Sequence, residues 1–295
     1  MNKKKRFWTT IMILALLALI AVLGYLAWYM YQDYLARQHA QEVQETVSVS
    51  SVIKEEPEVE EESEAVSEIP EEDLGKEGEA TEVPDSIFVD LENPIDFAAL
   101  KEINPELYAW IQVDDTQINY PIAQRANDDG FYLHHDMYGD AVFAGCLYTE
   151  SVNSTDWTDP LTIIYGHNMR NQTMFYDLHK FESQEFFDSH PYFYIYSQDN
   201  IRVYEVFAAF TYDDRRTLEY FNLDDPEVFQ SYIDGVKTGT LDGWQGGHVR
   251  QETQVDANSR IVTLQTCVGA GGELRYLVQG VLVSEGGKVV NAENE

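Results

Sequence analysis

Cysteine and basic residues are both scarce in this sequence. Its 295 residues include 2 cysteines, and only 19 lysines and arginines face 52 aspartates and glutamates, so the formal net charge is −33. Two cysteines exclude a disulfide-rich scaffold and a four-cysteine zinc site. Beyond a short basic run at the N-terminus, no basic cluster offers the surface with which proteins bind nucleic acid, and we expect no nucleic-acid partner.

Long hydrophobic runs are scarce as well, because there is only one. It extends from Phe7 to Met30 without a charged residue, follows the basic run Lys3–Arg6 and ends among aromatic side chains. About 20 such residues span a bilayer, whereas a cleavable signal peptide has a shorter apolar region. The basic residues before the run place the N-terminus in the cytoplasm. We therefore predict that residues 1–39 form a basic tip and one uncleaved anchor in the cell membrane, with the rest of the chain extracellular.

Aromatic residues are missing from the next part of the chain. From Gln41 to Asp85 glutamate dominates, and valine, serine and proline are scattered through it. Such a segment cannot bury enough apolar surface to offset its ordering entropy, and its charges repel one another. We predict that residues 40–86 form a disordered acidic stalk. An acidic tail that binds a basic partner or metal ions is the alternative.

Residues 87–285 form a block rich in tyrosine, phenylalanine, isoleucine and valine, of a size for one domain. Helices are predicted after an N-cap at Asn93–Pro94 and over Met174–Phe187 and Pro226–Lys237. Few helices beside about eight strands predict a mainly β domain that closes, or nearly closes, into a barrel. Residues 286–295 are predicted to be a polar tail. The predicted strands are Tyr108–Val113, Gln117–Ile122, Val142–Tyr148, Leu161–Tyr165, Tyr192–Tyr196, Arg202–Tyr212, Arg260–Thr266 and Arg275–Val283.

The two cysteines lie in different surroundings. Cys146 is inside the apolar stretch "VFAGCLYTE", whereas Cys267 ends "IVTLQTC" at the edge of a glycine-rich loop. A Cys146–Cys267 disulfide is one interpretation for an exported protein. The other is that Cys146 is an ordinary buried thiol and Cys267 a reachable, reactive one.

A nucleophilic cysteine needs a base or a cation nearby to reach its thiolate form. His167 ends the apolar run "LTIIYGHN" as Cys267 ends its own, and the two can meet if their strands are neighbours in a barrel. A histidine in this position is also common as a structural residue. The other six histidines are predicted to be surface or packing residues: His39, His134, His135, His179, His190 and His248.

Several segments together resemble one family. "TLQTC" with a downstream "RYLV", and "YGHNM", are similar to the signature of sortases, the membrane-anchored cysteine transpeptidases of Gram-positive bacteria. The resemblance covers about residues 104–284. "LYAWIQVDDTQINYPIAQ", "YLHHDMYG" and "YGHNMRNQTMFYDLHKF" follow one another in the order and with the content of class B sortases.

The resemblance implies an eight-stranded sortase barrel in which Cys267, His167 and Arg275 are catalytic. Cys267 would attack the threonine carbonyl in a C-terminal sorting motif of a secreted protein and form a thioacyl enzyme. His167 would protonate the leaving amine and deprotonate the incoming one, which belongs to a cell-wall precursor or a pilin. Arg275 would hold the substrate backbone or the oxyanion.

Three other functions remain open at this point: a pilin-polymerising sortase, a cysteine peptidase that transfers the acyl group to water, and a non-catalytic surface adaptor. We expect no cofactor and no metal site, since histidine and cysteine do not occur at close ligand spacing.

Overall fold

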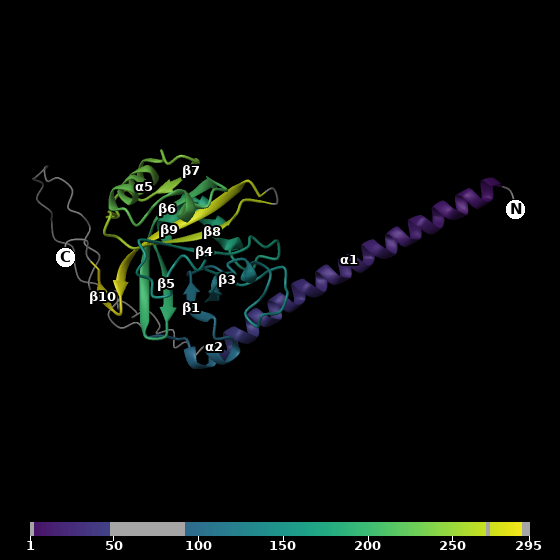
Figure 1. Ribbon diagram of the computed structural model, residues 1–295, viewed down its shortest axis with the longest axis horizontal. Helices are drawn as coiled ribbons and strands as arrows, with labels where there is room; N and C mark the ends of the chain where they lie inside the picture. The colour runs from purple at the N-terminus through teal and green to yellow at the C-terminus, as the bar shows by residue number, and fades with distance from the viewer. Residues whose placement is uncertain (1–2, 48–91, 270–271, 291–295) are drawn as a thin grey trace, which may run out of the picture.

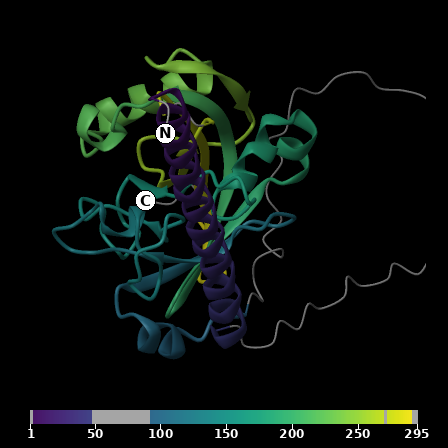
Figure 2. The same ribbon diagram turned by 90° about the vertical axis from the view of Figure 1, so that its right-hand side faces the viewer.

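The computed structural model describes residues 3–47, 92–269 and 272–290. Helix α1 (Lys3–Val47) projects far from a domain that contains all the strands (Figure 1). Figure 2 is turned so that the N-terminus of α1 faces the viewer, and its other end lies at the bottom of the domain. Among the described residues, α1 is the one helix long and apolar enough to span a membrane by length and composition.

Eight strands close into a barrel, which confirms the predicted mainly β fold. Their order is β9-β8-β4-β3-β2-β1-β5-β6, and the antiparallel pairing of β6 with β9 closes the ring. Two further strands, β7 (Trp244–Val249) and β10 (Lys288–Val289), extend the sheet from β6 and β9. The barrel strands are β1 (Leu107–Gln112), β2 (Asn119–Ala123), β3 (Leu147–Tyr148), β4 (Leu161–Tyr165), β5 (Tyr192–Ser197), β6 (Asn200–Asp213), β8 (Ile261–Cys267) and β9 (Leu274–Glu285).

Much of the barrel wall is buried on both faces, so several strands are near-continuous apolar runs. One core cluster fills the interior, and a second lies between the wall and α5 (Pro226–Thr238). A third lies under α2 (Phe97–Ile103) and the last turns of α1. Two 3-10 helices, η1 (Phe131–Leu133) and η2 (Tyr176–Glu182), and the short helices α3 (Gln184–Ser189) and α4 (Thr217–Tyr220) fill the connections.

Helix α5 matches its prediction, because its sequence carries signals at both ends. Asp225 caps it by accepting a hydrogen bond from the backbone N–H of Glu227, and Pro226 occupies the first turn. Gly239 ends the helix at a φ of 66°, in the left-handed region that glycine adopts without strain. Phe229 and Ile233, one turn apart, are buried against the barrel.

Three predicted elements differ from the structure, and one strand was not predicted. The helix expected after Asn93 begins at Phe97 instead, because the carboxylate of Asp96 accepts from two N–H groups of its first turn. The segment Met174–Phe187 is not one helix but η2 and α3, which meet at Ser183. Of Val142–Tyr148 only the last two residues are strand, since a turn with Gly145 at a φ of 62° precedes them. Strand β7 was missed because its WQGGHV sequence is polar, glycine-rich and largely exposed.

The first residues of the predicted stalk, 40–47, belong to a helix. Helix α1 continues to Val47, and the side chains of Val43 and Val47 are fully buried against the domain. Gln44 Nε2 donates to the carbonyl oxygen of Asn119 over 2.6 Å. These apolar residues follow Ala36 and Ala40 at helical spacing, so they form a stripe that the domain covers. Residues 48–86 of the predicted stalk lie outside the described residues, and part of the predicted C-terminal tail is strand β10.

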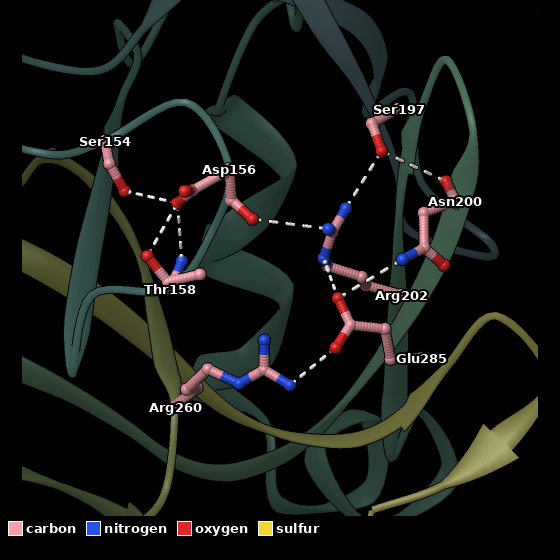
Figure 3. A network of polar contacts seen from close by, with 8 residues as sticks. All are labelled: Ser154, Asp156, Thr158, Ser197, Asn200, Arg202, Arg260 and Glu285. Atoms are coloured by element: carbon pink, nitrogen blue, oxygen red, sulfur yellow. Dashed lines mark hydrogen bonds and ion pairs between the residues drawn. The ribbon is translucent and has the colours of Figure 1, made fainter.

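A charged network ties β6 to β9 at the end of the barrel where β8 begins and β9 ends (Figure 3). Arg202, which is 8% exposed, donates from Nε to Glu285 Oε1 over 2.8 Å, and its Nη1 donates to Ser197 Oγ. Arg260 Nη2 lies 2.6 Å from the second carboxylate oxygen of Glu285. Burial raises the pKa of Glu285, but its hydrogen bond with Arg260 and the two positive charges outweigh burial and hold that pKa below its usual value.

We expect Glu285→Gln to lower the free energy of unfolding by about 2–3 kcal/mol at pH 7, because it leaves the buried Arg202 without its counter-charge. Urea unfolding measures this, with Glu252→Gln as the control, since Glu252 is 64% exposed and 3.8 Å from Arg250. The lowered pKa means that the stabilisation is present above about pH 4.5 and is lost as pH falls through the folded-state value. Equal losses in both variants would contradict this.

Candidate active site

The ends of three neighbouring strands carry the residues predicted to be catalytic. Strands β4 and β8 are parallel, with Tyr165 opposite Gln265, and the backbone N–H of Gly166 continues this ladder to the Gln265 carbonyl. The same register carries His167 to the level of Cys267. Strands β8 and β9 are antiparallel, and Cys267 is paired with Arg275. His167 therefore lies at the same level of the barrel wall as Cys267 and Arg275, which are about 100 residues further along the chain.

They also lie on the same face of that wall. A side chain at Gly166 would clash with Leu147 and Phe175 of the barrel interior, so His167, the next residue, faces outward. Cys267 and Arg275 are a cross-strand pair and share a face. Residues two positions along, such as Leu277, belong to the outer cluster under α5, which identifies this face as the outer one.

The two cysteines are both free thiols, so the disulfide interpretation is wrong. Cys146 is 3% exposed, and its Sγ contacts the carbonyl oxygen of Pro121 at 3.7 Å. Burial raises the pKa of the Cys146 thiol well above its ordinary value, which makes it unreactive. Cys267 is only partly buried, and a reagent or substrate can reach it from the outer face.

His167 is fixed in one orientation. Its Nε2 lies 2.9 Å from the Leu133 carbonyl oxygen, which can only accept, so Nε2 carries the proton and Nδ1 is the basic nitrogen of the neutral ring. Phe143 stacks on the ring at 5.6 Å. Burial lowers the pKa of His167; the bond to Leu133 opposes this, and the nearby His134 adds to it. His167 is therefore mainly neutral at pH 7.

Arg275 is held by the loop that joins β8 to β9. Its Nη1 donates to the carbonyl oxygens of Gly272, at 2.5 Å, and Leu274, at 3.1 Å. The backbone N–H of Val268 donates to the same Leu274 carbonyl and narrows the loop at its base. The guanidinium has five N–H donors in a planar fork, so it can hold this loop and still present donors to a bound group.

An aromatic and polar group that the sequence did not reveal lies next to the thiol. Tyr148 stacks on Tyr165 at 5.4 Å, and Tyr165 donates to Glu150, which forms an ion pair of 2.6 Å with Arg216. Burial raises the pKa of Tyr148 to about 12, aided by the charges of Glu150 and, more weakly, Cys267. The sequence pattern gave no signal for this group of side chains, because its members come from three separate segments of the chain.

His179 and Asn168 contact Cys267 directly, so the interpretation of His179 as an ordinary surface or packing residue is incomplete. Asn168 Nδ2 donates to the Cys267 carbonyl oxygen over 3.0 Å and lies 2.9 Å from His179 Nε2. His179 Nε2 is itself 3.2 Å from that carbonyl oxygen. The only sequence signal was the position of Asn168 directly after His167.

The described residues contain one group of side chains with metal-ligand chemistry: His39, Asp136 and Asp140 have ligand atoms within 4.8 Å of one another. Asp136 accepts from the backbone N–H groups of Tyr138 and Asp140 and from His39 Nδ1 at 2.5 Å. These bonds join α1 to the loop before β3, which accounts for the group as a structural contact.

Comparison with known proteins points to one family. A family model described as "Sortase domain" matches residues 111–283. Sortase B of Listeria monocytogenes is 32% identical over 190 residues, which cover 63% of this chain and 73% of that protein. Sortase B of Staphylococcus aureus is 26% identical over 181 residues, 60% of this chain and 69% of that protein. The X-ray structure of Clostridium perfringens sortase B matches with a TM-score of 0.56 and 29% identity, covering 64% of this chain and 100% of that structure.

Proposed function

Because this chain belongs to the sortase family of transpeptidases and is similar to class B members, we propose that it joins secreted proteins to an amine of the cell wall through a thioacyl intermediate on Cys267. The secreted protein is recognised at a C-terminal sorting motif. The observation that carries this proposal is the common level and face of Cys267, His167 and Arg275 on three neighbouring strands.

The first half of the reaction cleaves the substrate. Neutral His167 accepts the thiol proton of Cys267 at Nδ1 as the sulfur attacks the carbonyl carbon of the scissile peptide bond. The resulting imidazolium then protonates the leaving amine, so the peptide bond breaks and the acyl group stays on sulfur as a thioester. His167 returns to its neutral form.

The second half transfers the acyl group. The incoming amine attacks the thioester carbonyl, neutral His167 takes the amine proton, and the proton returns to the Cys267 thiolate as it leaves. A thioester is reactive enough to acylate an amine, so the exchange of one amide for another needs no ATP outside the cell. Sulfur chemistry therefore suits an exported enzyme.

Arg275 stabilises the negative charge that develops on the carbonyl oxygen or holds the substrate backbone next to it. It is paired with Cys267 across the two strands, and a guanidinium offers several donors in a planar fork that matches a carbonyl oxygen or a peptide backbone. Because the loop carbonyls of Gly272 and Leu274 already hold the guanidinium, the Arg275 side chain loses little conformational freedom when substrate binds.

We expect Arg275→Lys to lower kcat/KM about 100-fold or more, because an ammonium keeps the charge but cannot offer two parallel donors. A quenched peptide panel carrying sortase-type motifs measures this loss. Arg170→Lys is the control, since Arg170 is an exposed arginine on the loop after His167. A variant Arg275→Lys with nearly full activity would show that the fork has no role.

We propose that α1 anchors the enzyme in the cell membrane, with the N-terminus in the cytoplasm and the catalytic domain outside. Its apolar, uncharged Phe7–Met30 portion and the basic residues before it support this orientation. Protease added to intact cells should digest the domain. Complete protection of the domain under conditions that degrade a known surface protein would contradict the orientation.

The nature of the acceptor decides between transfer and hydrolysis. The peptide panel is cleaved with and without hydroxylamine, a small nucleophile that captures thioesters. Hydroxylamine gives the hydroxamate from the thioester of either enzyme, so it reports only that the thioester forms. With a peptide amine in place of hydroxylamine, a transpeptidase gives the ligated product, whereas a cysteine peptidase gives the free acid. Comparing wall-precursor and pilin amines as acceptors then separates wall anchoring from pilin polymerisation. An adaptor without catalysis cleaves no peptide.

A further inference from the structure

We propose that Asn168, supported by His179, is a positioning residue that fixes the end of strand β8 so that the Cys267 thiol is aligned with His167. The proposal rests on the proposed function, because alignment matters only if this pair reacts. It assigns a task to two polar side chains that contact neither the Cys267 sulfur nor, in the proposed mechanism, the substrate.

The parallel ladder between β4 and β8 shows why an extra donor is needed. Bonds from β4 to β8 recur every second residue, and the one from the Gly166 N–H reaches the Gln265 carbonyl. The next bond would reach the Cys267 carbonyl from the backbone of Asn168. There the chain turns away, since the backbone N–H of Phe175 bonds to the His167 carbonyl and Asn168 forms a bridge with Met174. At this position the side-chain amide of Asn168 donates to the Cys267 carbonyl oxygen, over 3.0 Å.

His179 holds the Asn168 amide in place. A carboxylate only accepts, so the 2.6 Å contact of His179 Nδ1 with Glu182 places a proton on Nδ1. In the neutral ring Nε2 is then an acceptor, and it receives the second N–H of Asn168 over 2.9 Å, so the 3.2 Å approach of Nε2 to the Cys267 carbonyl oxygen is a contact between two acceptors and not a hydrogen bond. Both hydrogens of the amide are thus used, one on Cys267 and one on His179. If the amide were turned over, its oxygen would face the Cys267 carbonyl oxygen, which can only accept.

His179 also contacts β9, the strand that carries Arg275. The ring of His179 stacks on Tyr276 at 5.0 Å, and Tyr276 is the neighbour of Arg275 on β9. Tyr276 is 2% exposed, so this contact is with a fixed part of the barrel. Asn168 follows His167 in the chain, and Tyr276 follows Arg275. The contacts of Asn168 and His179 with each other, with the Cys267 backbone and with Tyr276 therefore link all three proposed catalytic positions.

Three variants test the positioning role with the peptide that the wild-type protein cleaves fastest, in the presence of hydroxylamine. Asn168→Ala removes the donor, Asn168→Asp keeps the volume but cannot donate, and His179→Phe keeps the stack on Tyr276 but loses both ring nitrogens. We expect kcat to fall about 10- to 100-fold for both Asn168 variants and about 5-fold or more for His179→Phe. KM should stay within about threefold, because the substrate contacts remain.

Two further variants separate positioning from general stability. His179→Gln places an acceptor near the position of Nε2 and should recover most of the activity that His179→Phe loses. His190→Phe is the matched control: like His179, His190 stacks on an aromatic ring and bonds to a carboxylate, but its partners are Phe186 and Asp115, away from Cys267. It should retain wild-type kcat. The melting temperatures of all variants should stay within about 3 °C of the wild type.

The outcomes distinguish this proposal from the proposed function. A wild-type protein that cleaves none of the peptides contradicts the function itself. An active wild type with Asn168→Ala and Asn168→Asp within twofold of its kcat overturns the positioning role, as does an equal loss in His190→Phe. If Asn168→Ala does not fold, Asn168→Asp and His179→Phe decide the question by the same criteria. A loss that appears in KM with kcat unchanged would also overturn it.

Discussion

Cys267→Ala should abolish both cleavage and transfer, because it removes the only group that can hold the acyl fragment. Cys267 lies at the level of His167 and opposite Arg275, on the accessible outer face of the barrel wall. Cys267→Ser should lose nearly as much, since a hydroxyl has too high a pKa for an imidazole to activate it as it activates a thiol. The peptide panel with hydroxylamine measures both products.

The second cysteine is the matched control for this prediction. Cys146→Ala removes a thiol of the same chemistry from a buried position, so activity should remain within about twofold of the wild type. Mass spectrometry after mild alkylation should then find the label on Cys267 alone, because the pKa of Cys146 is raised by burial. Turnover by Cys267→Ala, or a larger loss in Cys146→Ala, would refute Cys267 as the nucleophile.

His167→Ala should lower kcat/KM by about 10²- to 10⁴-fold, the usual contribution of a general acid–base. The bond of Nε2 to Leu133 leaves Nδ1 as the nitrogen that exchanges protons with the thiol and the amines. Because the neutral ring must accept the thiol proton, wild-type kcat/KM should fall as pH drops through the pKa of His167. Burial places that pKa below 6.5, so the acidic limb should lie there.

The acidic limb provides a sharper test than the loss of rate. It should disappear in His167→Ala, whose residual activity has no imidazole to protonate at this position. His134→Ala is the control, since its ring is 6.1 Å from His167 and is not bonded to the same carbonyl; it should stay within a few-fold of the wild type. An acidic limb that persists in His167→Ala would assign the base to another residue.

The strands and the two strand ends could be predicted because their signals are local. Leu161–Tyr165 is a short apolar run between turns and has the same bounds in the structure. Cys267 and His167 each end such a run, and the barrel indeed makes β4 and β8 neighbours. The Asn93 cap failed for an equally local reason, because Asp96 competes for the same helix start and its carboxylate reaches two N–H groups.

Register and long-range contacts could not be predicted, and they determine the remaining part of the site. The role of Asn168 depends on where β4 leaves β8, which a turn around Met174 decides. His179 was one of six histidines predicted to be surface or packing residues, and only the packing of η2 against β8 and β9 brings it to Cys267. The apolar stripe that ends at Val47 was not predicted, because its last residues lie among the glutamates at the start of the acidic segment.

The contact at the end of α1 changes how the enzyme reaches its substrates. The backbone N–H of Asp96 donates to the Val47 carbonyl oxygen over 2.8 Å, so the end of α1 is bonded directly to the start of the domain. With the helix in the bilayer up to Met30, the remaining turns to Val47 form a rigid post of about 25 Å at 1.5 Å per residue. If the proposed anchoring holds, the outer face that carries Cys267 lies at a fixed height above the lipid surface, and the secreted protein has to bring its sorting motif to that level.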